Sequence, residues 1–149
     1  MSVRAKTMAF VVLAGCLDGG TLSAHHPVAD NYDTGTVITL RGMTAMVFFG
    51  APHSYLALDV QDNSGRVTRW VVEGDERQKV MSAGLTRAAA SPGTILTVTA
   101  FAPKAGASLV EAIPSAPQAV LDAAKAGRLA HGLQLLLPDG RKIGIGQRE

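Results

Sequence analysis

Apolar and polar residues alternate along several short stretches of the chain, as they do in β-strands that turn one face toward a core. The clearest example is residues 54–61. One face of this stretch carries Leu56, Leu58 and Val60, and the opposite face carries Tyr55, Ala57 and Asp59. A turn sequence, Asp62-Asn63-Ser64-Gly65, follows, and residues 66–73 are again rich in β-formers. Together these segments predict a hairpin.

In the return strand of this hairpin, Trp70 shares a face with Val72, so we expect it to be the central packing residue. Further strands are predicted at residues 35–49, 94–101, 131–137 and 141–145, the last two joined by the turn Pro138-Asp139-Gly140. The first is long and is expected to bend at Gly42, since a glycine inside a strand often marks a bulge or bend. Residues 74–83 and 117–128 have helical composition and are followed or ended by glycine.

Five main strands with a helix between the third and fourth predict a mainly β fold, a small OB-like five-stranded barrel with one or two short helices. Closure of such a barrel removes exposed sheet edges. We expect one domain over residues 35–149, with a helical insertion near 108–129. The polar residues 25–34 are expected to form an extended arm.

The first 24 residues resemble a secretory signal. Arg4 and Lys6 precede an uncharged, mostly apolar run over residues 7–17, and small residues lead to Ala24. The run is shorter than the roughly 20 residues that span a bilayer. Cleavage after Ala24 predicts a periplasmic or secreted protein. The alternative is a lipoprotein signal over residues 1–15, because Leu13-Ala14-Gly15-Cys16 resembles a lipobox; Cys16 would then be lipidated and anchor the chain to a membrane.

The amino-acid composition argues against several classes of function. No cysteine follows Cys16, which excludes disulfides and thiol chemistry in the remaining chain. After Ala24 there are 12 basic and 11 acidic residues, and no basic cluster. This balance argues against a nucleic-acid partner.

Several motifs resemble a bacterial family of small exported β-barrel proteins classed as a domain of unknown function. The matching positions are His25-His26, Pro52-His53, residues 55–60, Trp70, Glu73, Pro92-Gly93 and Asp139-Gly140-Arg141. Ala51 stands where the family has asparagine before Pro-His, and Leu85 stands where a tryptophan is usual after glycine. The resemblance implies an exported β-barrel and no established activity.

The histidines are the main candidates for chemistry, because neutral imidazole is the commonest metal ligand and suits copper and zinc. His25, His26 and His53 are the possible metal ligands. Cleavage after Ala24 would also free the amine of His25, which could chelate copper together with its ring. The alternative is that the first two are solvated and that His53 fixes a loop. His131 is expected to be a core or rim residue, because it shares strand parity with Leu133 and Leu135.

No catalytic set is evident. Glu73 lies near Asp75 and Glu76, and such carboxylates can serve acid–base chemistry, but at a strand end we expect them to be solvated. Ser54 is adjacent to His53, and neighbouring residues in a strand point to opposite faces. We interpret Trp70, Tyr55 and Glu73 as possible ligand-binding or core residues.

The sequence thus favours a non-enzymatic module outside the cytoplasm that binds a small ligand or an envelope protein. A histidine-based copper or zinc protein is the second hypothesis, and a structural envelope component is the third. Contact with a membrane is expected only through the possible lipid anchor.

Overall fold

The computed structural model describes residues 27–105 and 116–148. Within these residues the fold is mainly β, as predicted. The elements are α1 (Val28–Asn31), β1 (Tyr32–Phe48), β2 (Ser54–Gln61), β3 (Val67–Gly74), α2 (Arg77–Ser82), β4 (Ile95–Pro103), α3 (Gln118–Lys125), β5 (Leu129–Leu136) and β6 (Lys142–Gly144). The predicted hairpins, the helix between the third and fourth strands and the helix near residue 120 are confirmed.

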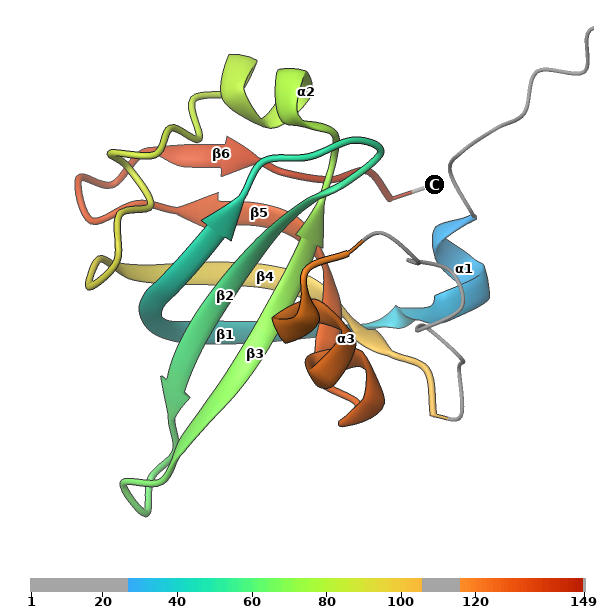
Figure 1. Ribbon diagram of the computed structural model, residues 1–149. Helices are drawn as coiled ribbons and strands as arrows, with labels where there is room; N and C mark the ends of the chain where they lie inside the picture. The colour runs from blue at the N-terminus through green and yellow to red at the C-terminus, as the bar shows by residue number, and fades with distance from the viewer. Residues whose placement is uncertain (1–26, 106–115, 149) are drawn as a thin grey trace, which may run out of the picture.

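The strands form one sheet in the order β3-β2-β1-β4-β5-β6, and an additional parallel pairing of β3 with β5 closes five of them into a ring (Figure 1). The other neighbouring strands are antiparallel. The short turn at Asp62 to Gly65 sets the β2–β3 register, in which Leu58 lies opposite Trp70 and Tyr55 opposite Glu73. The parallel seam places Glu73 opposite His131.

The long first strand is confirmed, and it curves from one side of the ring to the other (Figure 1). Its first part pairs with β4 and its last part with β2, and Met43 pairs with both. Gly42 lies directly before this changeover. A Cβ there would be 2.7 Å from the backbone oxygen of Asp59, so the close approach of the two strands requires glycine at this position.

The prediction of an extended arm over residues 25–34 is wrong for the described part of that segment. Residues 28–31 form α1, and β1 already begins at Tyr32, whose side chain is fully buried. Val28 is also buried. In the sequence, Val28 and Tyr32 stand among mostly polar residues, which is why the sequence pattern predicts an arm. Their burial against the sheet holds this segment in place.

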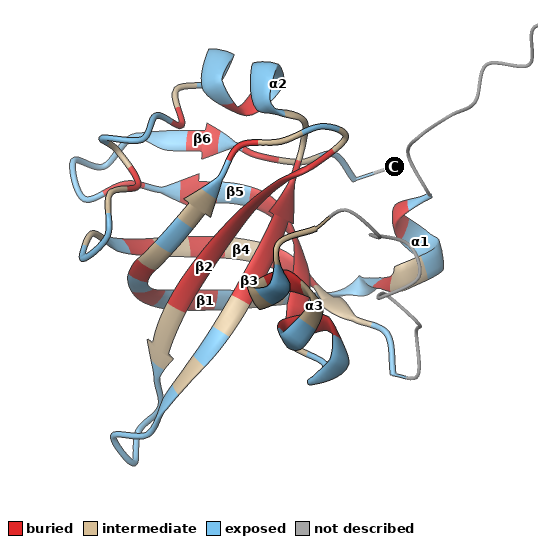
Figure 2. Ribbon diagram, viewed as in Figure 1, coloured by how far each residue is buried: buried red, intermediate tan, exposed pale blue. Residues whose placement is uncertain are grey.

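The sheet has apolar clusters on both of its faces, and buried residues run along most of β2 and along the half of β3 beside α3 (Figure 2). The inner cluster fills the ring and includes Leu56, Leu58, Leu96, Val98 and Leu135. The outer cluster is covered by α1 and α3. It includes Val28, Tyr32, Tyr55, Val71, Phe101, Val120 and Leu129. Both faces of β2 and β3 near α3 are therefore buried, although the alternation had suggested a single core face.

Trp70 is not the central packing residue that its parity suggested. It is only partly buried and packs against the margin of the inner cluster. Its partner Leu58 is 0 % exposed and occupies the interior. Parity gives the face of a strand on which a residue lies, but the position along the strand decides how deeply it is covered.

In β5 the alternation of residues between the two faces of the sheet is interrupted by a bulge. Thr99 pairs with Gln134 and Ala100 pairs with Gly132, so Leu133 is an extra residue in β5. Such a bulge reverses the faces on its two sides. His131 therefore shares the outer cluster with Leu133, whereas Leu135 belongs to the inner cluster. The prediction that His131 is buried is correct, but the face expected for it was wrong.

We predict that Leu58→Ala lowers the free energy of unfolding by about 2–5 kcal/mol, because a fully buried leucine is replaced by a cavity. Leu136→Ala is the matched control, since Leu136 is 38 % exposed and should change stability by less than about 1 kcal/mol. Chemical denaturation followed by circular dichroism measures both. Equal losses in the two variants would show that Leu58 is not in the core.

Candidate functional site

A buried carboxylate lies at the seam where β3 meets β5. Glu73 is the last residue but one of β3 and is 1 % exposed. The β2–β3 hairpin places Tyr55 opposite it, and the parallel pairing places His131 on its other side. The expectation that Glu73 is solvated at a strand end is therefore wrong, because this strand end is covered by the outer cluster.

Three polar side chains surround the Glu73 carboxylate. The hydroxyl of Tyr32 donates a hydrogen bond of 3.0 Å to Oε2. Nδ1 of His53 lies 3.6 Å from Oε1, and Nδ1 of His131 lies 3.7 Å from the same oxygen. We call Tyr32, His53, Glu73 and His131 the Glu73 cluster. Its members come from four different segments of the chain, the start of β1, the loop before β2, the end of β3 and β5.

His131 is held in one orientation. Its Nε2 lies 2.8 Å from the backbone oxygen of Gln147, which can only accept a hydrogen bond, so Nε2 carries the proton. The ring stacks on Phe101 at a centroid distance of 6.3 Å, and the ring of Tyr32 lies 5.3 Å from it on a tilted plane. Among the described residues, Nδ1 is buried and has no hydrogen-bond partner.

His53 is the least buried side chain of the cluster, at 8 % exposed. It follows the cis peptide bond between Ala51 and Pro52 and lies directly before β2. Its ring meets the ring of Tyr55 edge-on at 6.5 Å. His53 and Glu73 each have at least one interaction in addition to those described here.

The pKa values of Tyr32 and Tyr55 are both raised by their surroundings at this site. Burial raises the pKa of Tyr32 well above the ordinary value of a phenol, and the nearby Glu73 carboxylate raises it further. The same two causes, in the same order, raise the pKa of Tyr55. Both phenols are thus kept neutral next to a carboxylate, as expected where low solvation and negative charge act together.

Sequence reasoning found part of this site. His53, Tyr55 and Glu73 were candidates, and the structure brings them together. Trp70 belongs to the inner cluster instead. Tyr32 was missed, and His131 was assigned to the core alone, because the β1–β4 and β3–β5 pairings that place them are long-range. Cys16, His25 and His26 lie outside the described residues.

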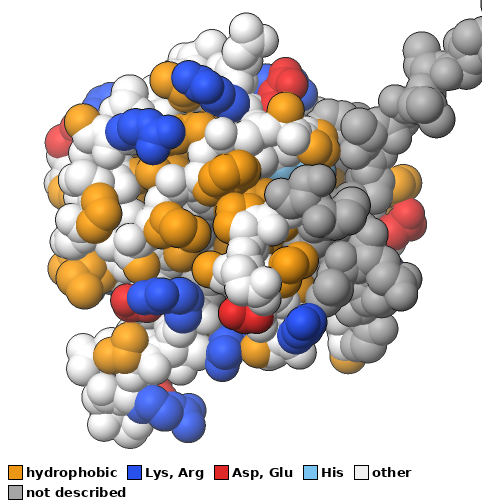
Figure 3. All heavy atoms as spheres, viewed as in Figure 1, with side chains coloured by type: hydrophobic (Ala, Val, Ile, Leu, Met, Phe, Trp, Pro, Cys, Tyr) orange, Lys and Arg blue, Asp and Glu red, His pale blue; other side chains and the backbone are white. Residues whose placement is uncertain are grey.

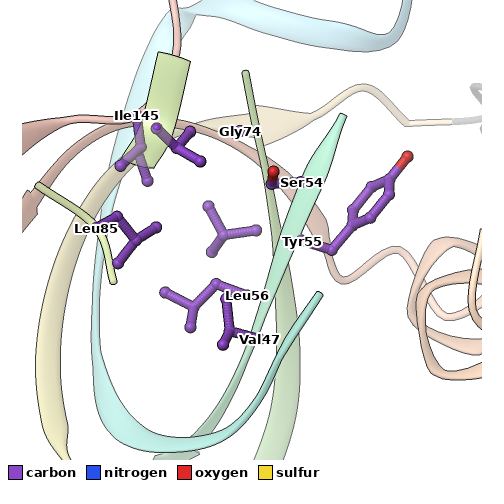
Figure 4. A pocket seen from close by; sticks show the side chains of 9 residues that line it. Val47, Ser54, Tyr55, Leu56, Gly74, Leu85 and Ile145 are labelled. Carbon is purple, nitrogen blue, oxygen red and sulfur yellow. The ribbon is translucent and has the colours of Figure 1, made fainter. Parts of the chain in front are cut away.

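The described residues do not form a finished metal site, and the hollow inside the ring is small. In residues 27–105 and 116–148, no group of three or more His, Cys, Asp or Glu side chains could by itself hold a metal ion. A hollow with a cavity volume of about 10 Å³ lies inside the ring, where Val47, Leu56, Leu85 and Ile145 face it and Tyr55 points away (Figure 4). It is smaller than the 300–1,000 Å³ typical of small-molecule sites.

The chain belongs to DUF6152, a family of unknown function whose model matches residues 15–110. This confirms the predicted membership of a family that is a domain of unknown function. No curated protein and no solved structure matches the chain. In the described part of the chain, no helix has the length and apolar character needed to cross a membrane.

We predict that neither tyrosine of this protein ionises near pH 10 while the chain is folded. The chain has two tyrosines, Tyr32 and Tyr55, and the pKa of each is raised. The unfolded chain should release both protons at about pH 10. Because the folded state then holds more protons than the unfolded state, stability should fall as the pH rises above about 10. The ultraviolet absorbance of phenolate measures this.

The control is the same titration in guanidinium chloride, where both phenols are exposed. A phenolate signal near pH 10 in protein that circular dichroism shows to be folded would contradict the burial of that tyrosine.

Proposed function

We propose that this protein acts outside the cytoplasm and binds a transition-metal ion, copper or zinc, at the Glu73 cluster. One observation carries the proposal. Nδ1 of His131, which bears no proton when the ring is neutral, is buried and lies 3.7 Å from the Glu73 carboxylate.

The electrostatics of this arrangement favour a cation. A neutral His131 with its proton on Nε2 turns the lone pair of Nδ1 toward a negatively charged oxygen, and burial strengthens their repulsion. A positive charge between the two atoms removes this repulsion. It could be a proton, but a charge-assisted hydrogen bond would draw the atoms to about 2.7–2.9 Å, closer than they are.

The spacing also suits a metal ion. In a tetrahedral site with ligand bonds of about 2.0–2.2 Å, neighbouring ligand atoms are about 3.3–3.6 Å apart. The separations of 3.6 and 3.7 Å between Glu73 Oε1 and the two histidine nitrogens lie close to this range. The bond from His131 Nε2 to a backbone carbonyl is also the usual second contact of a metal-bound histidine.

Further ligands are needed, because the described residues alone do not form a metal-holding group. His25 and His26 are the candidates. His26 is bonded to Pro27, and Val28 is buried in the same outer cluster as Tyr32 and Tyr55. His25 and His26 are the histidines that come directly before Pro27 in the sequence, and the double variant described below tests whether they contribute.

The other hypotheses have less support. The interior hollow is small and apolar, which disfavours a small organic ligand there. On the face shown in Figure 3, hydrophobic side chains lie among charged and other side chains, and no feature of the described residues favours a partner protein over a metal ion. A structural envelope role remains the outcome if no metal binds.

We further propose that the ring is an OB-like barrel. The cyclic strand order β1-β2-β3-β5-β4 supports this assignment, as does the parallel pairing of β3 with β5. The helix α2 between β3 and β4 also agrees with it. In this description β6 and α3 are additions to the five-stranded core.

We predict that the mature protein binds Cu²⁺ or Zn²⁺ and does not bind Mg²⁺ or Ca²⁺ with comparable affinity, because the ligands include imidazole nitrogen. His53→Ala and Glu73→Gln should each weaken binding at least tenfold, and His25→Ala/His26→Ala tests the contribution of the N-terminal pair. Isothermal titration calorimetry measures the affinities, and elemental analysis measures metal in protein purified from its native compartment.

Glu76→Gln is the matched control, because Glu76 is only half-buried and lies outside the cluster. It should bind metal as the wild type does. The proposal fails if wild type binds no tighter than an unstructured peptide, or if Glu73→Gln and Glu76→Gln have equal affinity.

We also predict that intact mass spectrometry of the native protein shows removal of the signal after Ala24, so that the chain begins at His25. Deletion of residues 7–13, the apolar part of the signal, should keep the protein in the cytoplasm with the rest of its signal uncleaved. A mass that corresponds to a lipidated Cys16 would establish the lipoprotein alternative. Full-length protein in the wild-type cell would contradict export.

A further inference from the structure

We propose that the C-terminal segment, residues 145–148, is a positioning element that fixes the tautomer and the orientation of His131. The inference rests on the proposed function only for what His131 binds, since the orientation itself can be tested without metal. The segment follows β6 and runs across the seam between β3 and β5.

Four contacts hold this segment against the cluster. Ile145 donates its backbone N–H to Leu133 and accepts a hydrogen bond from Asp75 at its carbonyl, which ties it to β5 and to the end of β3. Its side chain is buried in the inner cluster. Gln147 accepts the bond from His131 Nε2, and the guanidinium of Arg148 lies over the ring of Phe101 at 5.9 Å.

These contacts act on His131 from two directions. Arg148 covers Phe101, and Phe101 in turn stacks on the imidazole. The Gln147 carbonyl accepts a hydrogen bond from the N–H of Nε2, so that the lone pair of a neutral ring is at Nδ1, on the side of Glu73. The segment thus decides which nitrogen is available to a cation.

Gly146 makes this close contact possible. A Cβ on Gly146 would be 2.2 Å from the backbone oxygen of Gly132 and 3.1 Å from His131 Nε2. The backbone oxygen cannot rotate away, so an alanine here must push the segment off the seam. By contrast, a Cβ on Gly144 meets nothing within 4 Å. Two glycines only two residues apart therefore differ in whether a methyl group can be added.

The experiment compares wild type, Gly146→Ala and Gly144→Ala by long-range ¹H–¹⁵N correlation of the histidine rings in metal-free protein. The His131 signals are assigned with His131→Asn. We expect the Nε2–H tautomer in wild type and Gly144→Ala, and a mixture or the Nδ1–H tautomer in Gly146→Ala. We expect Gly146→Ala to lower Cu²⁺ or Zn²⁺ affinity about 10- to 100-fold, and Gly144→Ala to leave it unchanged.

An Nδ1–H tautomer in wild type would overturn the inference. It would also be overturned if folded Gly146→Ala kept both the wild-type tautomer and the wild-type affinity. If Gly146→Ala does not fold, a chain that ends at Gly146 removes the Gln147 carbonyl while keeping Ile145, and the same loss of the Nε2–H tautomer is expected. Wild type with the expected tautomer but no metal affinity would refute the proposed function and support the positioning role.

Discussion

The burial of the Glu73 carboxylate constrains the rest of this structure. A carboxylate removed from water is costly unless hydrogen-bond donors or cations compensate it. Here the Tyr32 hydroxyl donates one hydrogen bond to the carboxylate, and two imidazole nitrogens lie beside its other oxygen. Each of these three groups comes from a different part of the chain. Tyr32 requires the start of β1 to reach the seam, and His131 requires the parallel pairing with β3. The polar cluster and the closure of the ring therefore depend on each other.

The second apolar cluster explains how such a group can be buried at the end of a strand. The ring encloses one core, but Glu73 points out of it, toward the cluster that α1 and α3 cover. Val28, Phe101 and Val120 exclude water from that side. Without this cover the carboxylate would be solvated, as is normal for an acidic residue at a strand end. The helices outside the ring therefore set the properties of the site.

The two oxygens of the Glu73 carboxylate have different neighbours, and the proposed chemistry of the site follows from this difference. One carboxylate oxygen accepts a hydrogen bond from a phenol, and the other faces two imidazole nitrogens at distances longer than hydrogen bonds. The phenols are kept neutral by burial and by the carboxylate charge. Oε1 of Glu73 is thus the oxygen that faces the two histidines. The proposed metal ion depends on this arrangement, and the C-terminal segment holds one of these histidines in place.

The sequence by itself determined the local structure. Alternation and turn residues predicted the β2–β3 hairpin, and the structure then showed the register that places Tyr55 opposite Glu73. Glycines and composition predicted α2, α3 and the final hairpin. Only the tertiary structure decided the depth of Trp70, the face of His131 beyond the bulge at Leu133, and the meeting of Tyr32 with Glu73. The reason is physical. Periodicity specifies which residues share a face of one element, whereas burial depends on which distant element covers that face, and the β1–β4 and β3–β5 pairings join segments far apart in the chain.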